Sequence, residues 1–202
     1  MGSAVDLTEL DSGTRAQLIQ RALELFERKG YPRTTVKDIV DAAGLTKGAF
    51  YHHFRSKEEV LEIIHNDYVD AQVEMCEKII GQYTDPREQI AQIARNTIIG
   101  LGEYRAHVSV YLQDRRFLTG VRRDNVTLRR NQVDRIFTGI VERGISSGAF
   151  RNDVDPKLVA FGLIGMCAWV INWWRPGGSL SLEEVAVQYV ELIFGGLLHT
   201  YD

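Results

Sequence analysis

The sequence predicts an all-α fold of about nine helices, arranged as a small N-terminal module and a larger C-terminal one. Apolar residues recur at helical spacing along most of the chain, and no segment shows the sustained alternation of a β-strand. Capping residues and Gly or Pro breakers divide this pattern repeatedly. The 202 residues, 45% of them hydrophobic, are enough to form one large core or two small ones.

Four helices are predicted in the first eighty residues. The first ends at Gly30, and a short second helix over 35–44 begins with a Thr cap and stops at a glycine. A third short helix covers 46–54. Ser56-Lys57-Glu58-Glu59 is a capping box, which starts a long fourth helix that reaches about Ile80.

Five further helical stretches follow. They cover about 86–99, 104–118, 122–146, 156–174 and 181–198. The first and fourth of these stretches open with Asp-Pro, in which Asp caps and Pro occupies the first helical position. The last opens with a second capping box.

Charge is distributed unevenly along the chain. Residues 12–57 hold nine Lys or Arg against four Asp or Glu, whereas 58–202 hold fifteen against twenty. The overall charge of -3 excludes a protein that coats nucleic acid by bulk charge. A basic head on an acidic body predicts a polyanionic partner for the head alone. We therefore expect an N-terminal domain over 1–57 and a second domain over 58–202.

The stretch Leu158–Trp174 contains no charged residue. It is just short of the ~20 residues that a membrane-spanning helix needs. We therefore expect a helix that is buried on every side within the fold, with no membrane association. Two cysteines, Cys76 and Cys167, give no disulfide framework, and with no signal-peptide pattern the chain reads as cytoplasmic.

Residues 35–57, TVKDIVDAAGLTKGAFYHHFRSK, have the layout of a helix-turn-helix, with its two helices over about 35–54. A helix that enters a major groove must be short, polar outside and fixed by an apolar inner face. A glycine near its start lets phosphate approach the free N–H groups there. The residues expected to contact DNA are Thr34, Thr35, Thr46, Lys47, Gly48, Ala49, Tyr51, His52, His53 and Lys57. The spacing alone fits any compact three-helix unit equally well.

The residues themselves favour the DNA-binding interpretation. The pattern T-V-x-D-I-x-x-A-A-G-x-T-K-G-x-x-Y-H-H-F-x-S-K-E, within about 14–64, closely resembles the N-terminal signature of the TetR family of transcription regulators. The resemblance implies a DNA-binding head and a body that binds a small effector and forms a two-fold dimer on double-stranded operator DNA. By position, Thr46, Lys47, Gly48, Tyr51, His52 and Lys57 match residues that contact DNA across the family. Ala49 departs from the family pattern, so a base contact there is limited to a thymine methyl group.

A second local resemblance lies in the C-terminal part. Residues 169–178, W-x-x-x-W-W-R-P-G-G, are similar to a segment of TetR-type repressors that control fatty-acid and steroid breakdown and respond to acyl-CoA thioesters. Asn172 stands where those relatives often carry Arg. The resemblance implies an acyl-CoA effector. Two alternatives stay open: the tryptophans are simply core residues, or the effector is a drug-like or aromatic molecule.

An apolar effector tunnel is expected in the body. The expected lining residues are Tyr104, Val108, Tyr111, Leu112, Phe117, Phe137, Phe161, Met166, Trp169 and Trp173. Four nearby arginines are candidates either for a CoA phosphate or for salt bridges: Arg115, Arg116, Arg122 and Arg123.

The last helix predicts a homodimer, because its two apolar stripes are wider than one core contact needs. The expected interface residues are Leu182, Val185, Tyr189, Leu192, Ile193 and Gly196.

No catalytic residue, cofactor or metal site is expected. Gly144-Ile145-Ser146-Ser147-Gly148 matches the G-x-S-x-G nucleophile pattern, but that elbow needs a preceding strand, and a helix is predicted there. The five histidines show no HExxH spacing. A small helical enzyme and a non-DNA adaptor are the rival classes to a ligand-responsive repressor.

Overall fold

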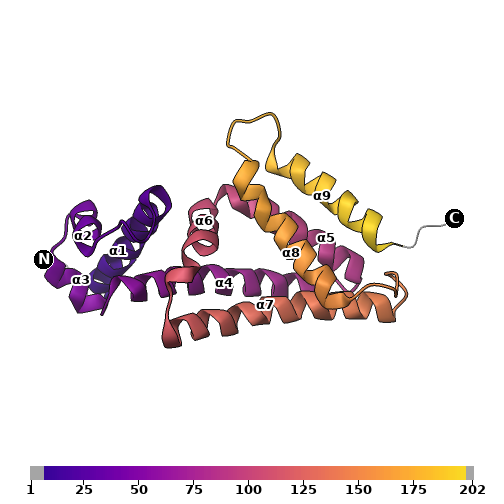
Figure 1. Ribbon diagram of the computed structural model, residues 1–202, viewed down its shortest axis with the longest axis horizontal. Coiled ribbons are helices and arrows are strands. Elements are labelled where there is room, and N and C mark those ends of the chain that lie inside the picture. Colours follow the sequence, from indigo (N-terminus) through magenta and orange to yellow (C-terminus); the bar gives the residue numbers. More distant parts are fainter. Residues whose placement is uncertain (1–6, 199–202) are drawn as a thin grey trace, which may run out of the picture. The chain divides into compact units, whose positions relative to one another are not determined.

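The computed structural model describes residues 7–198, and within them it contains nine α-helices, two 3₁₀ turns and no β-strand (Figure 1). This confirms the all-α prediction. The helices are α1 Leu7–Lys29, α2 Val36–Ala43, α3 Lys47–His53, α4 Lys57–Gln82, α5 Pro86–Ile99, α6 Arg105–Asp114, α7 Gly120–Ser146, α8 Pro156–Trp173 and α9 Leu182–Leu197. The 3₁₀ turns are η1 Gly100–Gly102 and η2 Arg115–Phe117.

The chain forms two compact units. The first comprises the described residues up to Tyr68 together with Ser109–Val126, and the second comprises Val69–Val108 together with the described residues from Thr127 onward. This division differs from the boundary expected at residue 57, because α4, α6 and α7 each contribute residues to both units. The expected limits of a DNA-binding domain over 1–57 and an effector-binding and dimerisation domain over 58–202 stay a prediction.

In the first unit, α1, α2 and α3 pack against one another. Local signals fix the two short helices. Thr35 and Asp38 form a capping box at the start of α2, and Gly44 ends α2 in the left-handed conformation with φ 66°. The buried core of this unit includes Leu18, Ala22, Leu23, Phe26, Ile39, Val40, Phe50, Phe54, Val60, Leu61 and Ile64.

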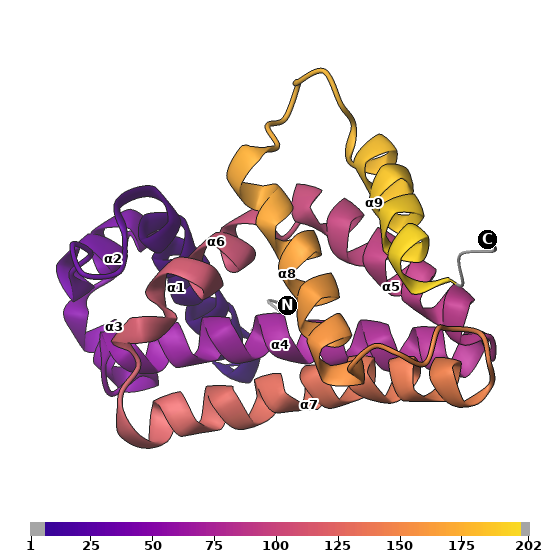
Figure 2. The ribbon, with the colours of Figure 1, turned by 45° about the vertical axis from the view of Figure 1, so that its right-hand side comes forward.

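In the second unit, α8 and α9 both pack on α5 (Figure 2). The segments of α4 and α7 in this unit lie side by side in both ribbon views, and Arg129 of α7 pairs with Asp70 of α4. The buried residues on the three packed helices include Ile90, Ile93, Ala94, Ile98, Leu163, Cys167, Val170, Val185, Ala186, Val190, Ile193 and Leu197.

The expectation that α8 is buried on every side is wrong for the single chain. Only 28% of Pro156–Trp173 is buried, and this helix is long and apolar enough to span a membrane by length and composition. Helices in protein cores share this length and composition. One face of α8 packs on α5, while the other presents exposed apolar side chains, namely Leu158, Phe161, Trp169 and Trp173.

Candidate nucleic-acid interface and effector cavity

The turn between α2 and α3 fixes the orientation of α3 relative to α2 in the first unit. Leu45 N–H donates to the Val40 carbonyl oxygen at 2.9 Å, which closes the end of α2. One residue later Thr46 caps α3, because its Oγ1 accepts from Ala49 N–H at 3.2 Å. Phe50, fully buried, anchors the inner face of α3 in the head core. Local hydrogen bonds and one apolar anchor therefore set the orientation of this short helix.

Six of the ten residues expected to contact DNA are exposed on the first unit: Thr35, Thr46, Lys47, Gly48, Tyr51 and His52. The large Tyr51 ring is 57% exposed, which is unusual for an aromatic side chain that has no partner outside the chain. A Cβ added at Gly48 meets only Thr46 Oγ1, at an ordinary 3.5 Å. Packing inside the head therefore does not require a glycine there, and Ala49 beside it is half-buried.

Thr34 is a structural residue, and its expected DNA contact is wrong. Its side chain is fully buried, and its hydroxyl lies 3.0 Å from the Gly30 carbonyl oxygen and 3.4 Å from that of Leu25. These bonds satisfy carbonyl groups at the end of α1. Burial leaves no surface for a phosphate to approach.

Lys57 also has partners within the head. Its ammonium donates to the carbonyl oxygens of Tyr31 at 2.7 Å and Thr34 at 2.6 Å, and it lies 4.0 Å from the centroid of the Tyr31 ring. An ammonium has three donors, so these bonds use two of them. The sequence predicted a phosphate contact; in the structure Lys57 connects the start of α4 to the loop between α1 and α2.

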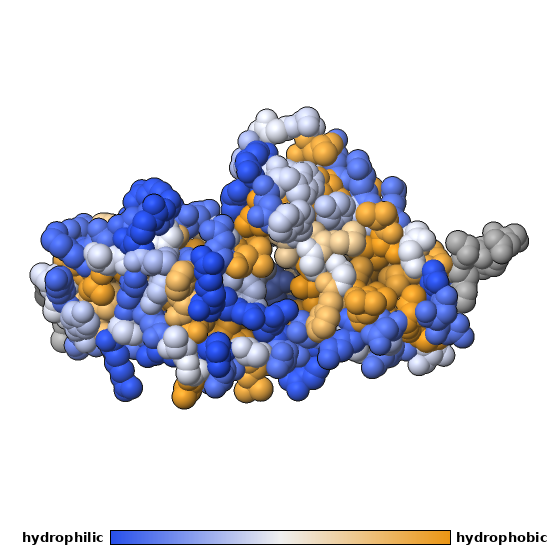
Figure 3. All heavy atoms as spheres, viewed as in Figure 1, coloured by the Kyte–Doolittle hydropathy of each residue, from blue (hydrophilic) through white to orange (hydrophobic). Residues whose placement is uncertain are grey.

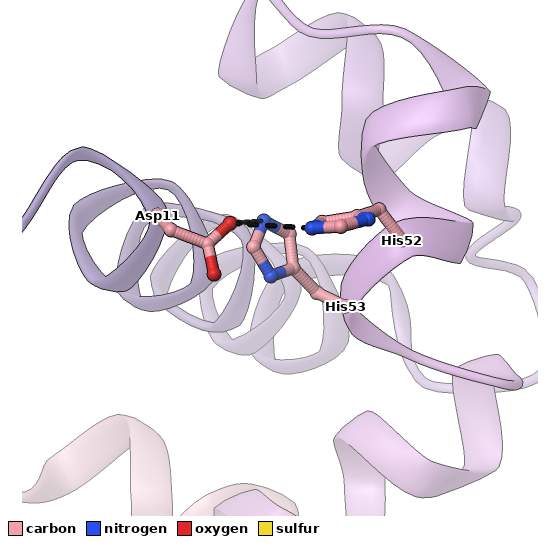
Figure 4. Close-up of side chains that lie close together, drawn as sticks. All are labelled: Asp11, His52 and His53. Carbon is pink, nitrogen blue, oxygen red and sulfur yellow. Dashed lines mark ion pairs between the residues drawn. The ribbon is translucent and has the colours of Figure 1, made fainter. Parts of the chain in front are cut away.

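His53 lies beside His52 at the end of α3, and both face Asp11 of α1 (Figure 4). His52 Nε2 and His53 Nε2 lie 3.4 and 3.5 Å from Asp11 Oδ1. The His53 side chain is only 6% exposed, whereas that of His52 is 70% exposed. Sequence spacing gave no sign of this cluster, because Asp11 is about forty residues away in the chain.

A cavity of about 500 Å³ lies in the second unit, within the size range of small-molecule sites. Its walls come from α4, α5 and the residues that follow α4 and η1: Ala71, Glu74, Met75, Lys78, Ile79, Gln82, Tyr83, Gln92, Asn96 and Tyr104. The lining carries one acidic side chain, one basic side chain and three amide groups beside three apolar side chains, Ala71, Met75 and Ile79. It is therefore more polar than the tunnel that the sequence predicted.

Of the ten residues expected to line a tunnel, Tyr104 alone lines this cavity. Tyr111, Leu112 and Phe117 belong to the first unit, where Tyr111 packs on His65 and Phe117 stacks on Tyr31. The others are divided between core and surface: Val108 and Phe137 are buried, Met166 is half-buried, and Phe161, Trp169 and Trp173 are exposed. Hydropathy could not separate these groups, because core, surface and cavity positions here all carry apolar side chains.

The basic cluster is likewise divided. Arg122 pairs with Glu59 and Glu62 of α4, and Arg116 lies over the Phe117 ring. For Arg122 the salt-bridge alternative therefore holds in the structure.

The expected dimer residues fall on both sides of α9. Leu182, Val185 and Ile193 are buried against the chain's own core, so the expectation that they face a partner is wrong. Leu192 is 63% exposed, Gly196 is exposed and Tyr189 is half-buried. One apolar stripe of α9 packs on α5. The face of α9 that is left for a partner is therefore narrower than the sequence predicted.

The G-x-S-x-G segment is not a nucleophile elbow. It lies at the end of α7, and a Cβ at Gly144 would approach the buried Phe150 ring to 2.0 Å. The glycine is thus required by the packing of Phe150. Burial also raises the pKa of the thiols of Cys76 and Cys167 to about 12, so neither is a reactive nucleophile.

Two family models match the chain. The model of bacterial regulatory proteins of the tetR family matches residues 18–64, which contain α2 and α3, and that of the tetracyclin repressor-like C-terminal domain matches residues 83–197. The chain belongs to the TetR family. The helix α3, with its exposed polar face, therefore lies in the N-terminal DNA-binding region of a TetR regulator.

Relatives of this TetR protein match it over nearly its full length. It is 33% identical to the HTH-type transcriptional repressor KstR2 of Rhodococcus jostii, over 98% of this chain and 97% of that protein. The structure of the ketosteroid transcriptional regulator KstR2 of Mycobacterium tuberculosis matches with a TM-score of 0.84 and 27% identity, over 98% of this chain and 99% of that one. AibR in complex with isovaleryl coenzyme A and operator DNA matches with a TM-score of 0.83 and 26% identity, over 91% and 99%.

Proposed function

We propose that this TetR regulator is a cytoplasmic transcriptional repressor that binds a palindromic operator as a homodimer. The exposed polar face of α3, with Thr46, Lys47, Gly48 and Tyr51, carries the proposal. A short helix held by an apolar inner face presents these side chains as a recognition helix would. Lys47 supplies a charge for phosphate, and the Tyr51 ring supplies a large contact surface.

The homodimer is proposed to form through α8 and α9. The outward face of α8 carries Leu158, Phe161, Trp169 and Trp173, and that of α9 carries Leu192. Figure 3 shows hydrophobic side chains on the surface of the second unit over these helices. Two copies of such a helix pair bury these faces as a four-helix interface.

An acyl-CoA thioester is proposed as the effector that releases the operator. AibR, whose complex holds isovaleryl coenzyme A, supports this class. The match to the fatty acid metabolism regulator of Bacillus subtilis fits it, because acyl chains are the subject of that metabolism. The cavity in the second unit offers a binding volume. A 100-fold loss of operator affinity requires about 2.7 kcal/mol of coupling, which the burial of a few acyl CH₂ groups at ~0.8 kcal/mol each can supply.

The same repressor with a different effector is the second candidate. Glu74, Gln92 and Asn96 give the cavity more hydrogen-bonding groups than an alkyl chain can use. An aromatic or drug-like molecule with several polar groups would use them better. A small helical enzyme or an adaptor has weaker support, since the relatives named above are transcription regulators.

Fluorescence anisotropy with labelled DNA from upstream of the gene tests both steps. We expect salt-dependent binding of the dimer, and release by a subset of acyl-CoA thioesters but not by the free acids. If only another class of ligand releases the DNA, the proposal of a repressor stands and the proposal of an acyl-CoA effector is replaced. Failure to bind any upstream DNA would overturn the proposal itself.

A further inference from the structure

We infer that Asp11, His52 and His53 form a binding site for one zinc ion in the first unit. Asp11 comes from α1, and the two histidines come from the last turn of α3 (Figure 4). One carboxylate oxygen and one ring nitrogen from each histidine all lie within 4.8 Å of one another. Imidazole nitrogen and carboxylate oxygen are ordinary zinc ligands in proteins.

The distances fit a metal site better than direct hydrogen bonds. Asp11 Oδ1 lies 3.4 Å from His52 Nε2 and 3.5 Å from His53 Nε2. A charge-assisted N–H···O bond is shorter, at about 2.7–2.9 Å. Tetrahedral zinc with Zn–N and Zn–O bonds of ~2.0–2.2 Å holds neighbouring ligand atoms about 3.3–3.5 Å apart. The carboxylate oxygen therefore already stands at the separation that a shared ion requires.

The surroundings of the cluster also fit a metal ion. The nearly buried His53 ring is held in place, whereas His52 and Asp11 are 70% and 56% exposed. An ion can therefore enter from solvent, and water can complete its coordination. Without an ion, an exposed Asp–His pair of this kind contributes little to stability.

The ion would also affect the proposed DNA surface, and this step rests on the proposed function. His52 is exposed on α3 and is one of the residues expected to contact DNA. A zinc ligand bond would hold its Nε2 toward α1. Zinc and operator DNA would then compete for one side chain. Linkage requires the effect to be reciprocal, so zinc should weaken operator binding by the same factor by which the operator weakens zinc binding.

Zinc binding by the full, tag-free chain is measured without DNA, by competition with a chromophoric chelator. We expect one ion per chain, with affinity at least ten-fold lower in Asp11→Asn and in His52→Gln. Asp41→Asn removes another exposed carboxylate of the first unit and should bind zinc as the wild type does. The ring ¹⁵N resonances of both His52 and His53 should shift on zinc addition. Unchanged affinity in Asp11→Asn, or unshifted ring resonances, would overturn the site.

Operator affinity is then measured with and without zinc. Zinc should weaken operator binding in the wild type several-fold and leave His52→Gln unaffected. Zinc binding that leaves operator affinity unchanged would overturn the coupling. If no DNA is bound under any condition, the proposed function fails, while the zinc titration still decides the site by itself.

Discussion

Lys57 and Tyr31 are joined twice: the Lys57 ammonium donates to the Tyr31 carbonyl oxygen at 2.7 Å and lies 4.0 Å from the centre of the Tyr31 ring. The Tyr31 N–H donates in turn to Asp114 Oδ2 at 3.2 Å. Burial lowers the pKa of Lys57 and raises that of Asp114, because partial removal from water disfavours the charged form of each group. The start of α4, the loop after α1 and the end of α6 therefore meet at one polar cluster within the first unit.

Replacing Lys57 with Met should destabilise the protein rather than remove a phosphate contact. Loss of two hydrogen bonds from a charged donor should lower the free energy of unfolding by about 1.5–3 kcal/mol. The salt dependence of operator binding should stay as in the wild type. Urea unfolding and anisotropy at several salt concentrations measure the two effects.

Lys47→Met is the matched control, because Lys47 is exposed on α3. It should leave the unfolding free energy within about 0.5 kcal/mol of the wild type and flatten the salt slope by about 1. If the salt dependence of operator binding is instead flatter in Lys57→Met and unchanged in Lys47→Met, Lys57 contacts DNA after all.

Leu192→Glu should dissociate the proposed dimer without unfolding the chain. The Leu192 side chain is 63% exposed in the single chain, so a charge there should not disturb folding. It should disturb only the packing of a second copy against this face. An unpaired charge buried in an apolar interface costs several kcal/mol. Sedimentation velocity should show monomers, with circular dichroism unchanged.

Gln188→Glu, also exposed on α9, serves as the control and should stay dimeric. Ile193→Glu should unfold the chain instead, since Ile193 is 4% exposed and packs inside the second unit. Stable dimers of Leu192→Glu would move the interface away from this face.

Ala71→Trp should fill part of the 500 Å³ cavity and make the repressor insensitive to its effector. The indole occupies existing space, so the unfolding free energy should fall by less than about 1.5 kcal/mol. Operator affinity without effector should match the wild type, and the effector concentration needed for release should rise at least ten-fold. Titration of DNA-bound protein with acyl-CoA thioesters measures the shift.

Glu77→Trp places the same group on an exposed position of α4, outside the cavity lining. It should respond to effector as the wild type does. A wild-type response from Ala71→Trp would show that the effector binds elsewhere.

His65 should make the protein less stable in mild acid. The ring is fully buried against Tyr111, and desolvation lowers its pKa to about 4 from the usual 6.5. The unfolded chain therefore binds the proton more readily, and stability is lost as the pH falls from 6.5 toward 4. The loss should be on the order of 3 kcal/mol. Urea unfolding at a series of pH values measures it.

His65→Gln removes this titration and should flatten the profile between pH 6.5 and 4. The exposed His52→Gln should keep the wild-type profile. Equal slopes in His65→Gln and wild type would assign the acid sensitivity to other groups.

Local chemistry in the sequence was enough to determine the helices. Thr35 with Asp38, Gly44, Asp85 before Pro86, and Ser181 with Glu184 act within a few residues, so their effect can be read without knowing the fold. The helix bounds consequently agree closely with expectation, except that the stretch expected over 104–118 divides into α6 and η2. The exposed residues of α3 were also predictable, because an amphipathic helix this short has one inner face.

Tertiary packing alone decided which side chains of suitable chemistry are available to a partner. Thr34 and Lys57 carry groups that bind phosphate, yet the fold turns both toward backbone carbonyls of the head. Leu192 and Ile193 are adjacent and both apolar, but only Ile193 is buried. The cavity lining and the Asp11 cluster join residues from different helices, whose proximity depends on long-range packing. Sequence periodicity specifies which face of each helix is apolar. It does not specify whether that face packs on another helix of the chain, lines a cavity or binds a partner.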